Sequence, residues 1–91
     1  MADVRWDAQA FDDLAGIIRY IERFDPQAAE GIGSRLYELA YSLADFPQRG
    51  RPGPNGTREM VTVPPYILSY VFAGDTVRIV GIRHGRQRPR G

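Results

Sequence analysis

Residues 66–82 read YILSYVFAGDTVRIVGI, and this stretch decides the fold. Its two halves, Tyr66–Phe72 and Thr76–Ile82, are rich in β-branched and aromatic residues, which favour β-strands. The intervening Ala73-Gly74-Asp75 has the length and composition of a tight hairpin connection. The sequence therefore predicts two strands joined as a hairpin.

Two further strands are predicted outside this hairpin. REMVTV, at Arg58–Val63, has the same character, and ADVRW, at residues 2–6, reads as a short first strand. Because prolines cannot take part in regular pairing, we expect a bend or a wide loop at Pro64-Pro65. We expect the first strand to pair alongside the final one.

Apolar residues recur at helical spacing between the first strand and the others. The first stripe predicts an amphipathic helix over roughly residues 8–23, with Asp7 as its N-cap. Its members are Phe11, Leu14, Ile17, Ile18 and Ile21. The second predicts a helix that starts with Asp25 as N-cap and Pro26 in the first turn, and ends at about Ala44. Its members are Ile32, Leu36, Leu39 and Leu43.

The order strand, helix, helix, strand, strand, strand predicts one α+β domain over residues 1–91. In this fold an antiparallel helical hairpin packs on a mainly antiparallel four-stranded sheet. Phe46–Thr57, rich in proline and glycine, is expected to be one long irregular stretch.

Composition excludes several kinds of site. The chain has no cysteine and a single histidine, so disulfides, thiolate metal sites and histidine-rich metal sites are excluded. No apolar run approaches the roughly 20 residues of a membrane span. The N-terminus shows no signal-peptide pattern. We expect a cytoplasmic protein that uses no membrane, metal or cofactor.

Charge is divided unevenly along the chain, although the net charge is only +1. Residues 1–47 hold nine of the eleven acidic residues, whereas residues 48–91 hold eight of the twelve arginines and no lysine. Arginine favours planar, bidentate contact with phosphate or carboxylate groups. The basic half therefore indicates an anionic partner, either nucleic acid or an acidic protein segment.

Six arginines of this half are candidates for contact with a target or a nucleic acid: Arg49, Arg51, Arg58, Arg83, Arg86 and Arg88. The first two lie in the irregular stretch, Arg58 starts a strand, and the last three belong to a tail expected after the final strand. The alternative is that these arginines are solvated.

His84 and Glu59 are the candidate acid and base for cleaving a phosphodiester. His84 is the only side chain that ordinarily titrates near neutrality, and neighbouring guanidinium groups could stabilise the developing charge. The alternative for His84 is a hydrogen-bonded structural role. Tyr37 and Tyr41, one helical turn apart, are expected to pack on the sheet, with a partner surface as the alternative.

The whole pattern resembles the RelE/ParE superfamily of bacterial type II toxins. The closing IRHGRQRP, Ile82–Pro89, is the most characteristic part. The other matching segments are Trp6 with Ala8, Asp12–Glu22, Asp25–Ala29, Leu43–Arg51, Thr57–Glu59, Tyr66–Phe72 and Val77–Pro89.

This resemblance implies a β-α-α-β-β-β fold and a cognate antitoxin whose C-terminal segment wraps and neutralises the toxin. RelE-like members cut mRNA in the ribosome, whereas ParE-like members poison DNA gyrase. Operator DNA is expected to be contacted only through the antitoxin. If the chain is an enzyme, the resemblance implies a metal-independent endoribonuclease.

By position, Arg58 and Arg83 match the arginines that RelE-like nucleases use to stabilise phosphate. His84 or Glu59 would then move protons. The segment His84–Arg88 lacks the aromatic residue that several RelE-like nucleases carry there. The tail is closer to ParE-like members, so we expect a gyrase inhibitor, with an mRNA endonuclease or an inactive, antitoxin-binding relative as alternatives.

Overall fold

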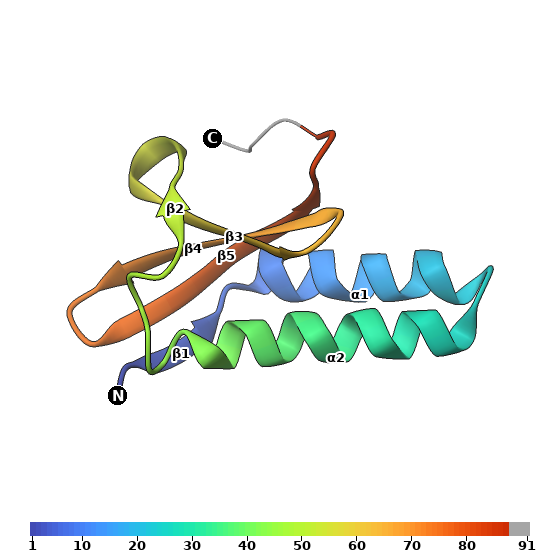
Figure 1. Ribbon diagram of the computed structural model, residues 1–91, viewed down its shortest axis with the longest axis horizontal. Helices are drawn as coiled ribbons and strands as arrows, with labels where there is room; N and C mark the ends of the chain where they lie inside the picture. The colour runs from blue at the N-terminus through green and yellow to red at the C-terminus, as the bar shows by residue number, and fades with distance from the viewer. Residues whose placement is uncertain (88–91) are drawn as a thin grey trace.

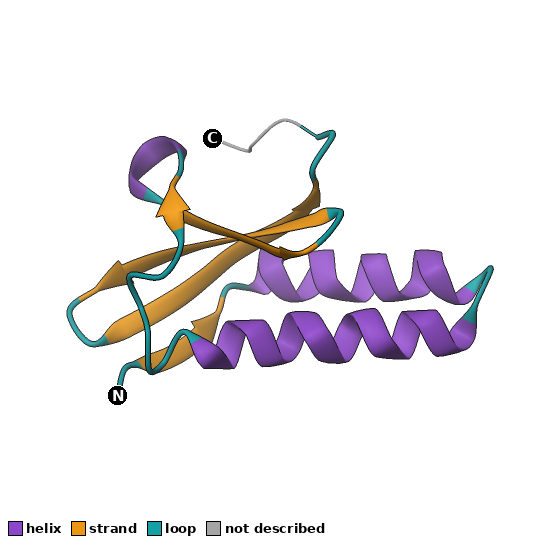
Figure 2. Ribbon diagram, in the orientation of Figure 1, coloured by secondary structure: helices purple, strands orange, loops and turns teal. Residues whose placement is uncertain are grey.

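The structure of the protein is a computed structural model that describes residues 1–87, and in it two helices lie along one face of a sheet (Figures 1 and 2). The elements are β1 (Asp3–Trp6), α1 (Ala8–Glu22), α2 (Pro26–Ser42), β2 (Arg51–Pro52), a 3-10 helix (Pro54–Gly56), β3 (Arg58–Val63), β4 (Tyr66–Ala73) and β5 (Thr76–His84). The predicted α+β class is confirmed.

The sheet has five strands in the order β1-β5-β4-β3-β2. β1 pairs with β5 in parallel, as expected, and all other neighbours are antiparallel. The predicted count of four strands is wrong by one, because Arg51 and Pro52 pair with Glu59 and Arg58 at the edge of the sheet. A two-residue strand has no periodicity that a sequence pattern could reveal.

The connection between β3 and β4 is tighter than expected. Val63 pairs with Tyr66, so Pro64 and Pro65 form a two-residue turn with a cis peptide bond between them. Both prolines occupy turn positions, where neither has to donate a hydrogen bond to the ladder. Of the two alternatives expected here, the bend is confirmed and the wide loop is not.

β5 is longer than the sequence pattern indicated. It continues past Ile82 to His84, because Ile67 and Tyr66 of β4 pair with Arg83 and His84. Arg83 and His84 are consequently part of the sheet, not of a tail that follows it.

The two helices begin differently, although an aspartate precedes each of them. The carboxylate of Asp25 accepts a hydrogen bond from the backbone N–H of Ala28 at 3.1 Å, which confirms the predicted N-cap. Asp7 occupies the N-cap position of α1, but its side chain makes no capping bond. It instead forms an ion pair of 2.6 Å with Arg78 of β5, so its predicted capping role was wrong.

The core lies between the helical hairpin and the sheet. α1 and α2 contribute Ala10, Leu14, Leu36, Leu39 and Ala40, Leu43 follows directly after α2, and the strands contribute Met60, Val63, Leu68, Tyr70, Val77, Ile79 and Ile82. Phe11 departs from the predicted stripe, since 52% of it is exposed. α1 is also tied to β5 through Asp13, whose carboxylate accepts the backbone N–H of Ile82 at 2.9 Å.

Tyr70 holds the loop between α2 and β2 against the core. Its fully buried hydroxyl donates to the carbonyl of Pro47 at 2.8 Å and accepts the N–H of Gly50 at 2.9 Å. A Cβ on Gly50 would lie only 2.8 Å from the ring and hydroxyl of Tyr70. Glycine is therefore the residue that allows the backbone to come this close.

We expect Tyr70→Phe to lower the free energy of unfolding by about 1–3 kcal/mol, because it leaves the Gly50 N–H and the Pro47 carbonyl without their partner. Chemical denaturation monitored by circular dichroism measures the change. Tyr20→Phe, on an exposed side chain, is the matched control and should be neutral. Equal stability of the two variants would show that the hydroxyl does not anchor the loop.

Candidate functional site on the outer face of the sheet

The alternation of side chains along each strand divides the predicted site residues between two faces. Glu59 of β3 pairs with Ser69 of β4. Ile67, two residues before Ser69 and therefore on the same face of β4, pairs with Arg83 of β5. These side chains lie on the face of the sheet away from the helices. We call this the outer face. Arg58 and His84, as the neighbours of Glu59 and Arg83 along the chain, point to the helix side.

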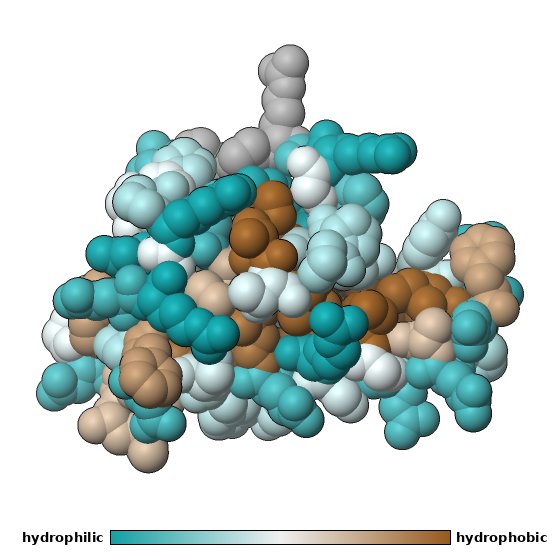
Figure 3. Space-filling view, in the orientation of Figure 1, coloured by the Kyte–Doolittle hydropathy of each residue, from teal (hydrophilic) through white to brown (hydrophobic). Residues whose placement is uncertain are grey.

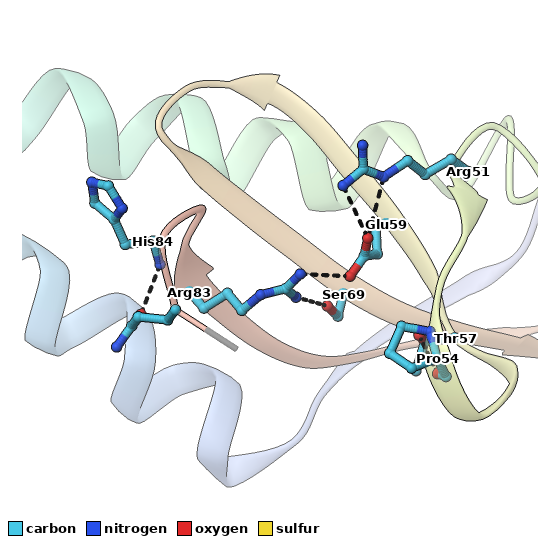
Figure 4. A network of polar contacts seen from close by, with 8 residues as sticks. Arg51, Pro54, Thr57, Glu59, Ser69, Arg83 and His84 are labelled. Atoms are coloured by element: carbon cyan, nitrogen blue, oxygen red, sulfur yellow. Dashed lines mark hydrogen bonds and ion pairs between the residues drawn. The ribbon is translucent and has the colours of Figure 1, made fainter. Parts of the chain in front are cut away.

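A network of charged side chains occupies the outer face (Figure 4). The carboxylate of Glu59 contacts Arg51 at 3.2 Å through one oxygen and Arg83 at 2.9 Å through the other. Arg83 also donates to the hydroxyl of Ser69 at 3.3 Å. Glu59 is only 6% exposed, so a charge removed from water is balanced by two guanidinium groups.

The backbone at Gly53 covers Glu59. A Cβ on Gly53 would lie 2.9 Å from Cγ of Glu59 and 2.7 Å from the hydroxyl oxygen of Thr57. This segment is itself closed by a hydrogen bond of 2.8 Å from the Gly53 N–H to the Thr57 carbonyl. The loop expected to be irregular is therefore an ordered cover over the network.

Arg58 lies apart from the network and holds the same loop from the other side. Its guanidinium donates to the carbonyl of Gly50 at 2.8 Å and to that of Gln48 at 3.2 Å. Arg58 and Arg83, predicted to stabilise one phosphate, thus project from opposite faces of the sheet.

His84 orders the start of the C-terminal segment. Its Nδ1 accepts the backbone N–H of Arg86 at 3.1 Å, and its ring lies edge-on to Tyr66 at a centroid distance of 5.9 Å. The backbone N–H of His84 donates to the Gln87 side chain at 2.8 Å. In Figure 4 the imidazole points away from Glu59 and Arg83. These contacts match the structural role left open for this residue.

The remaining predicted arginines lie on the surface. Arg49 is exposed and donates to the hydroxyl of Ser42 at 3.1 Å, beside an open hollow lined by Phe46, Pro47 and Gln48. Arg86 is exposed next to His84, and Arg88 lies outside the described residues. Of the five candidates within residues 1–87, only Arg51 and Arg83 are brought together.

An aromatic surface joins Tyr37 and Tyr41, for which a partner surface was the alternative, to Trp6 and Phe11, which sequence reasoning did not connect with them. Trp6 stacks on Phe11 at 5.0 Å and faces Tyr37 at 6.3 Å, and Tyr37 contacts Tyr41 at 4.9 Å. Tyr37 and Tyr41 are 45% and 49% exposed, so the expectation that they pack on the sheet was wrong. A hydrogen bond with Tyr41 raises the pKa of Tyr37 above its ordinary value. Their helical spacing places the two tyrosines on one face of α2 but does not show whether that face is exposed.

Apolar side chains also gather along the helical hairpin, between hydrophilic ones (Figure 3). Ile17, Ile18 and Ile32 of the two helices are partly buried and pack against the core. Large exposed apolar surfaces on a small protein mark interaction sites. The aromatic surface, defined as Trp6, Phe11, Tyr37 and Tyr41, is thus a second candidate site.

Chemically, the outer face already holds one anionic group, the Glu59 carboxylate, between two guanidinium groups. Within residues 1–87 no group of three or more potential metal-ligating side chains is found. None of the helices in this part of the chain is long and apolar enough to span a membrane.

Comparison with known proteins identifies the family. Residues 4–89 match the family described as the ParE toxin of the type II toxin–antitoxin system parDE. Toxin RelE2 of Caulobacter vibrioides is 46% identical over 84 residues, which cover 92% of this chain and 96% of that protein. Toxin RelE1 of the same organism is 34% identical over 80 residues, 84% of this chain and 85% of the relative.

A solved structure has the same fold. A chain of the chromosomal ParDE toxin–antitoxin system from P. aeruginosa superposes with a TM-score of 0.83 at 21% identity, covering 92% of this chain and 96% of that one. The resemblance inferred from the sequence is thereby confirmed. The chain belongs to the ParE toxin family of type II toxin–antitoxin systems.

Proposed function

We propose that this toxin acts in the cytoplasm by binding DNA gyrase and that a cognate antitoxin neutralises it. The observation that carries the proposal is the state of the outer face. Both carboxylate oxygens of Glu59 are engaged by Arg51 and Arg83, so no free base stands beside the arginines. A protein that cuts RNA needs an acid and a base within reach of the phosphodiester.

His84 does not fill that role in the observed arrangement. It lies on the opposite side of β5 from Arg83, and Arg86 already donates to its Nδ1. A toxin that binds its target without cutting it requires neither residue to be free. This arrangement therefore supports the ParE-like action, with Arg49 and Arg86 as exposed cations for target contact.

An mRNA endonuclease is the second candidate, and the names of the two Caulobacter relatives, RelE1 and RelE2, favour it. In that reading Arg58 and Arg83 stabilise charge while Glu59 or His84 moves protons. Arg58 would first have to leave the carbonyls of Gln48 and Gly50. The nuclease therefore requires a rearrangement that the gyrase inhibitor does not.

The aromatic surface on the helical hairpin and β1 is suited to binding the antitoxin. The large aromatic rings of Phe11, Tyr37 and Tyr41 are about half exposed. Aromatic side chains of this kind are enriched where protein–protein contacts are strongest. We expect an amphipathic antitoxin segment to bury these rings, and we expect operator DNA to be contacted only through the antitoxin.

The gyrase proposal predicts that the antitoxin-free protein, at micromolar concentration, inhibits DNA supercoiling or traps cleaved DNA. The double variant Arg49→Ala/Arg86→Ala should weaken inhibition by about fivefold or more, because exposed cations steer and hold an anionic target complex. Arg19→Ala/Arg23→Ala, which removes the same charge from α1 and its end, is the control and should inhibit normally. Gyrase unaffected by the wild type at this concentration would exclude the proposal.

Incubation in a translation extract tests the nuclease alternative. We expect mRNA to remain intact with the wild-type toxin. Cleaved mRNA would instead establish the second candidate, in which Arg83→Ala should lower cleavage by about tenfold or more and Arg19→Ala should not. Expression without any growth arrest would favour an inactive relative over both candidates.

If the antitoxin binds the aromatic surface, we expect Tyr37→Ala to weaken antitoxin binding by about tenfold or more, because truncating a central aromatic contact removes much of the binding free energy. Isothermal titration with the purified antitoxin measures this. Tyr20→Ala, an exposed tyrosine that stacks only on Phe24, is the control. Equal affinities for the two variants would place the antitoxin elsewhere on the toxin.

A further inference from the structure

The charged network on the outer face has the composition of an anion-binding site. We propose that Arg51, Arg83 and Ser69 form a site for a phosphate oxyanion, and that the carboxylate of Glu59 occupies it in place of the phosphate. This inference concerns the outer face alone and does not depend on which target the toxin attacks.

Donors from three strands converge on one carboxylate. Arg51 comes from β2, Ser69 from β4 and Arg83 from β5, and Glu59 lies between them on β3 (Figure 4). Two guanidinium groups approach different oxygens of the carboxylate, at 3.2 and 2.9 Å. The guanidinium fork accepts carboxylate and phosphate oxygens with the same geometry.

The charge of the network is not balanced by Glu59. One carboxylate faces two guanidinium groups, and Arg83 is nearly buried, with 13% of its side chain exposed. A phosphate that carries two negative charges would neutralise the pair of arginines completely. Arg51 is 56% exposed and is partly screened by water, but the excess positive charge beside the buried Arg83 still matches a phosphate better than the single charge of Glu59.

Spare donors remain for a larger anion. The Nε–H of Arg83 is buried and has no hydrogen-bond partner among residues 1–87. The hydroxyl of Ser69, which accepts from Arg83, can donate its own proton to an anion. A carboxylate has two oxygens, whereas a phosphate offers three or four, which suits this larger number of donors.

The cover formed at Gly53 explains why the site is closed in the wild type. The Gly53 backbone packs directly on Cγ and Cδ of Glu59, so the side chain leaves no space for a second anion. Removing the side chain beyond Cβ opens a space bounded by the same donors. Replacing it with the isosteric glutamine removes the charge but leaves that space filled.

This difference gives a direct test. Glu59→Ala and Glu59→Gln remove the same charge from the same place, but only the alanine variant vacates the site. We expect inorganic phosphate to raise the midpoint of thermal unfolding of Glu59→Ala by about 4 °C or more relative to chloride at equal ionic strength. Its affinity for phosphate should exceed that of the wild type by about tenfold or more.

Two further variants establish where the phosphate binds. Glu59→Gln should show no phosphate effect beyond that of the wild type, and Glu59→Ala/Arg83→Ala should lose the effect. If Glu59→Ala folds poorly in chloride, the yield on refolding in phosphate against chloride replaces the melting temperature. A phosphate effect absent from Glu59→Ala, or equal in Glu59→Ala and Glu59→Gln, would overturn the proposal.

A second ligand, a short RNA, distinguishes a phosphate that belongs to a nucleic acid from a free phosphate group. A short single-stranded RNA with a 5′-terminal phosphate, which has the required two charges, that binds Glu59→Ala and not Glu59→Gln would identify the site as one for a nucleic-acid end. Binding of inorganic phosphate without binding of the RNA would identify it as a site for a free phosphate group. Both results retain Glu59 as the residue that keeps the site closed.

Discussion

The contact between the buried Glu59 carboxylate and the guanidinium groups of Arg51 and Arg83 controls the outer face of this toxin. A charge removed from water must be paired, and breaking such a pair is strongly destabilising. The contact joins the two-residue edge strand β2 to β3 and links both to β5. It also decides what the face can do, since the arginines are already occupied.

The loop between α2 and β3 is held from both faces of the sheet. On the helix side, the Tyr70 hydroxyl and the Arg58 guanidinium bind backbone groups of residues 47–50. On the outer side, Gly53 lies on Glu59. A basic loop that is ordered in this way holds the exposed Arg49, whose guanidinium donates to the Ser42 hydroxyl, in a fixed place beside the end of α2.

The sequence predicted the helices well because their signals are local. The Asp25 cap and the apolar stripes act within a few residues, and the strand runs of β3 to β5 are equally local. The pairing of Arg51 with Glu59 depends instead on contacts across the sheet, which no pattern in a two-residue strand can reveal. In the same way, β5 extends to His84 because its last two residues pair with β4.

The candidate site was predicted as a set of residues and not as an arrangement. Glu59 and Arg83 do lie together, but Arg58 and His84 are their sequence neighbours and point to the other side. Strand alternation was the signal that separates them. The exposure of Tyr37 and Tyr41 could not be read from their spacing, since a buried and an exposed stripe have the same period.

We propose that this toxin binds its target and does not cut RNA. Sequencing of transcript ends and of gyrase-linked DNA breaks from one culture, immediately after the toxin is expressed, tests it most directly. The account predicts that gyrase–DNA covalent complexes accumulate while the transcript ends stay unchanged. New mRNA ends within coding sequences, without added gyrase-linked breaks, would contradict it.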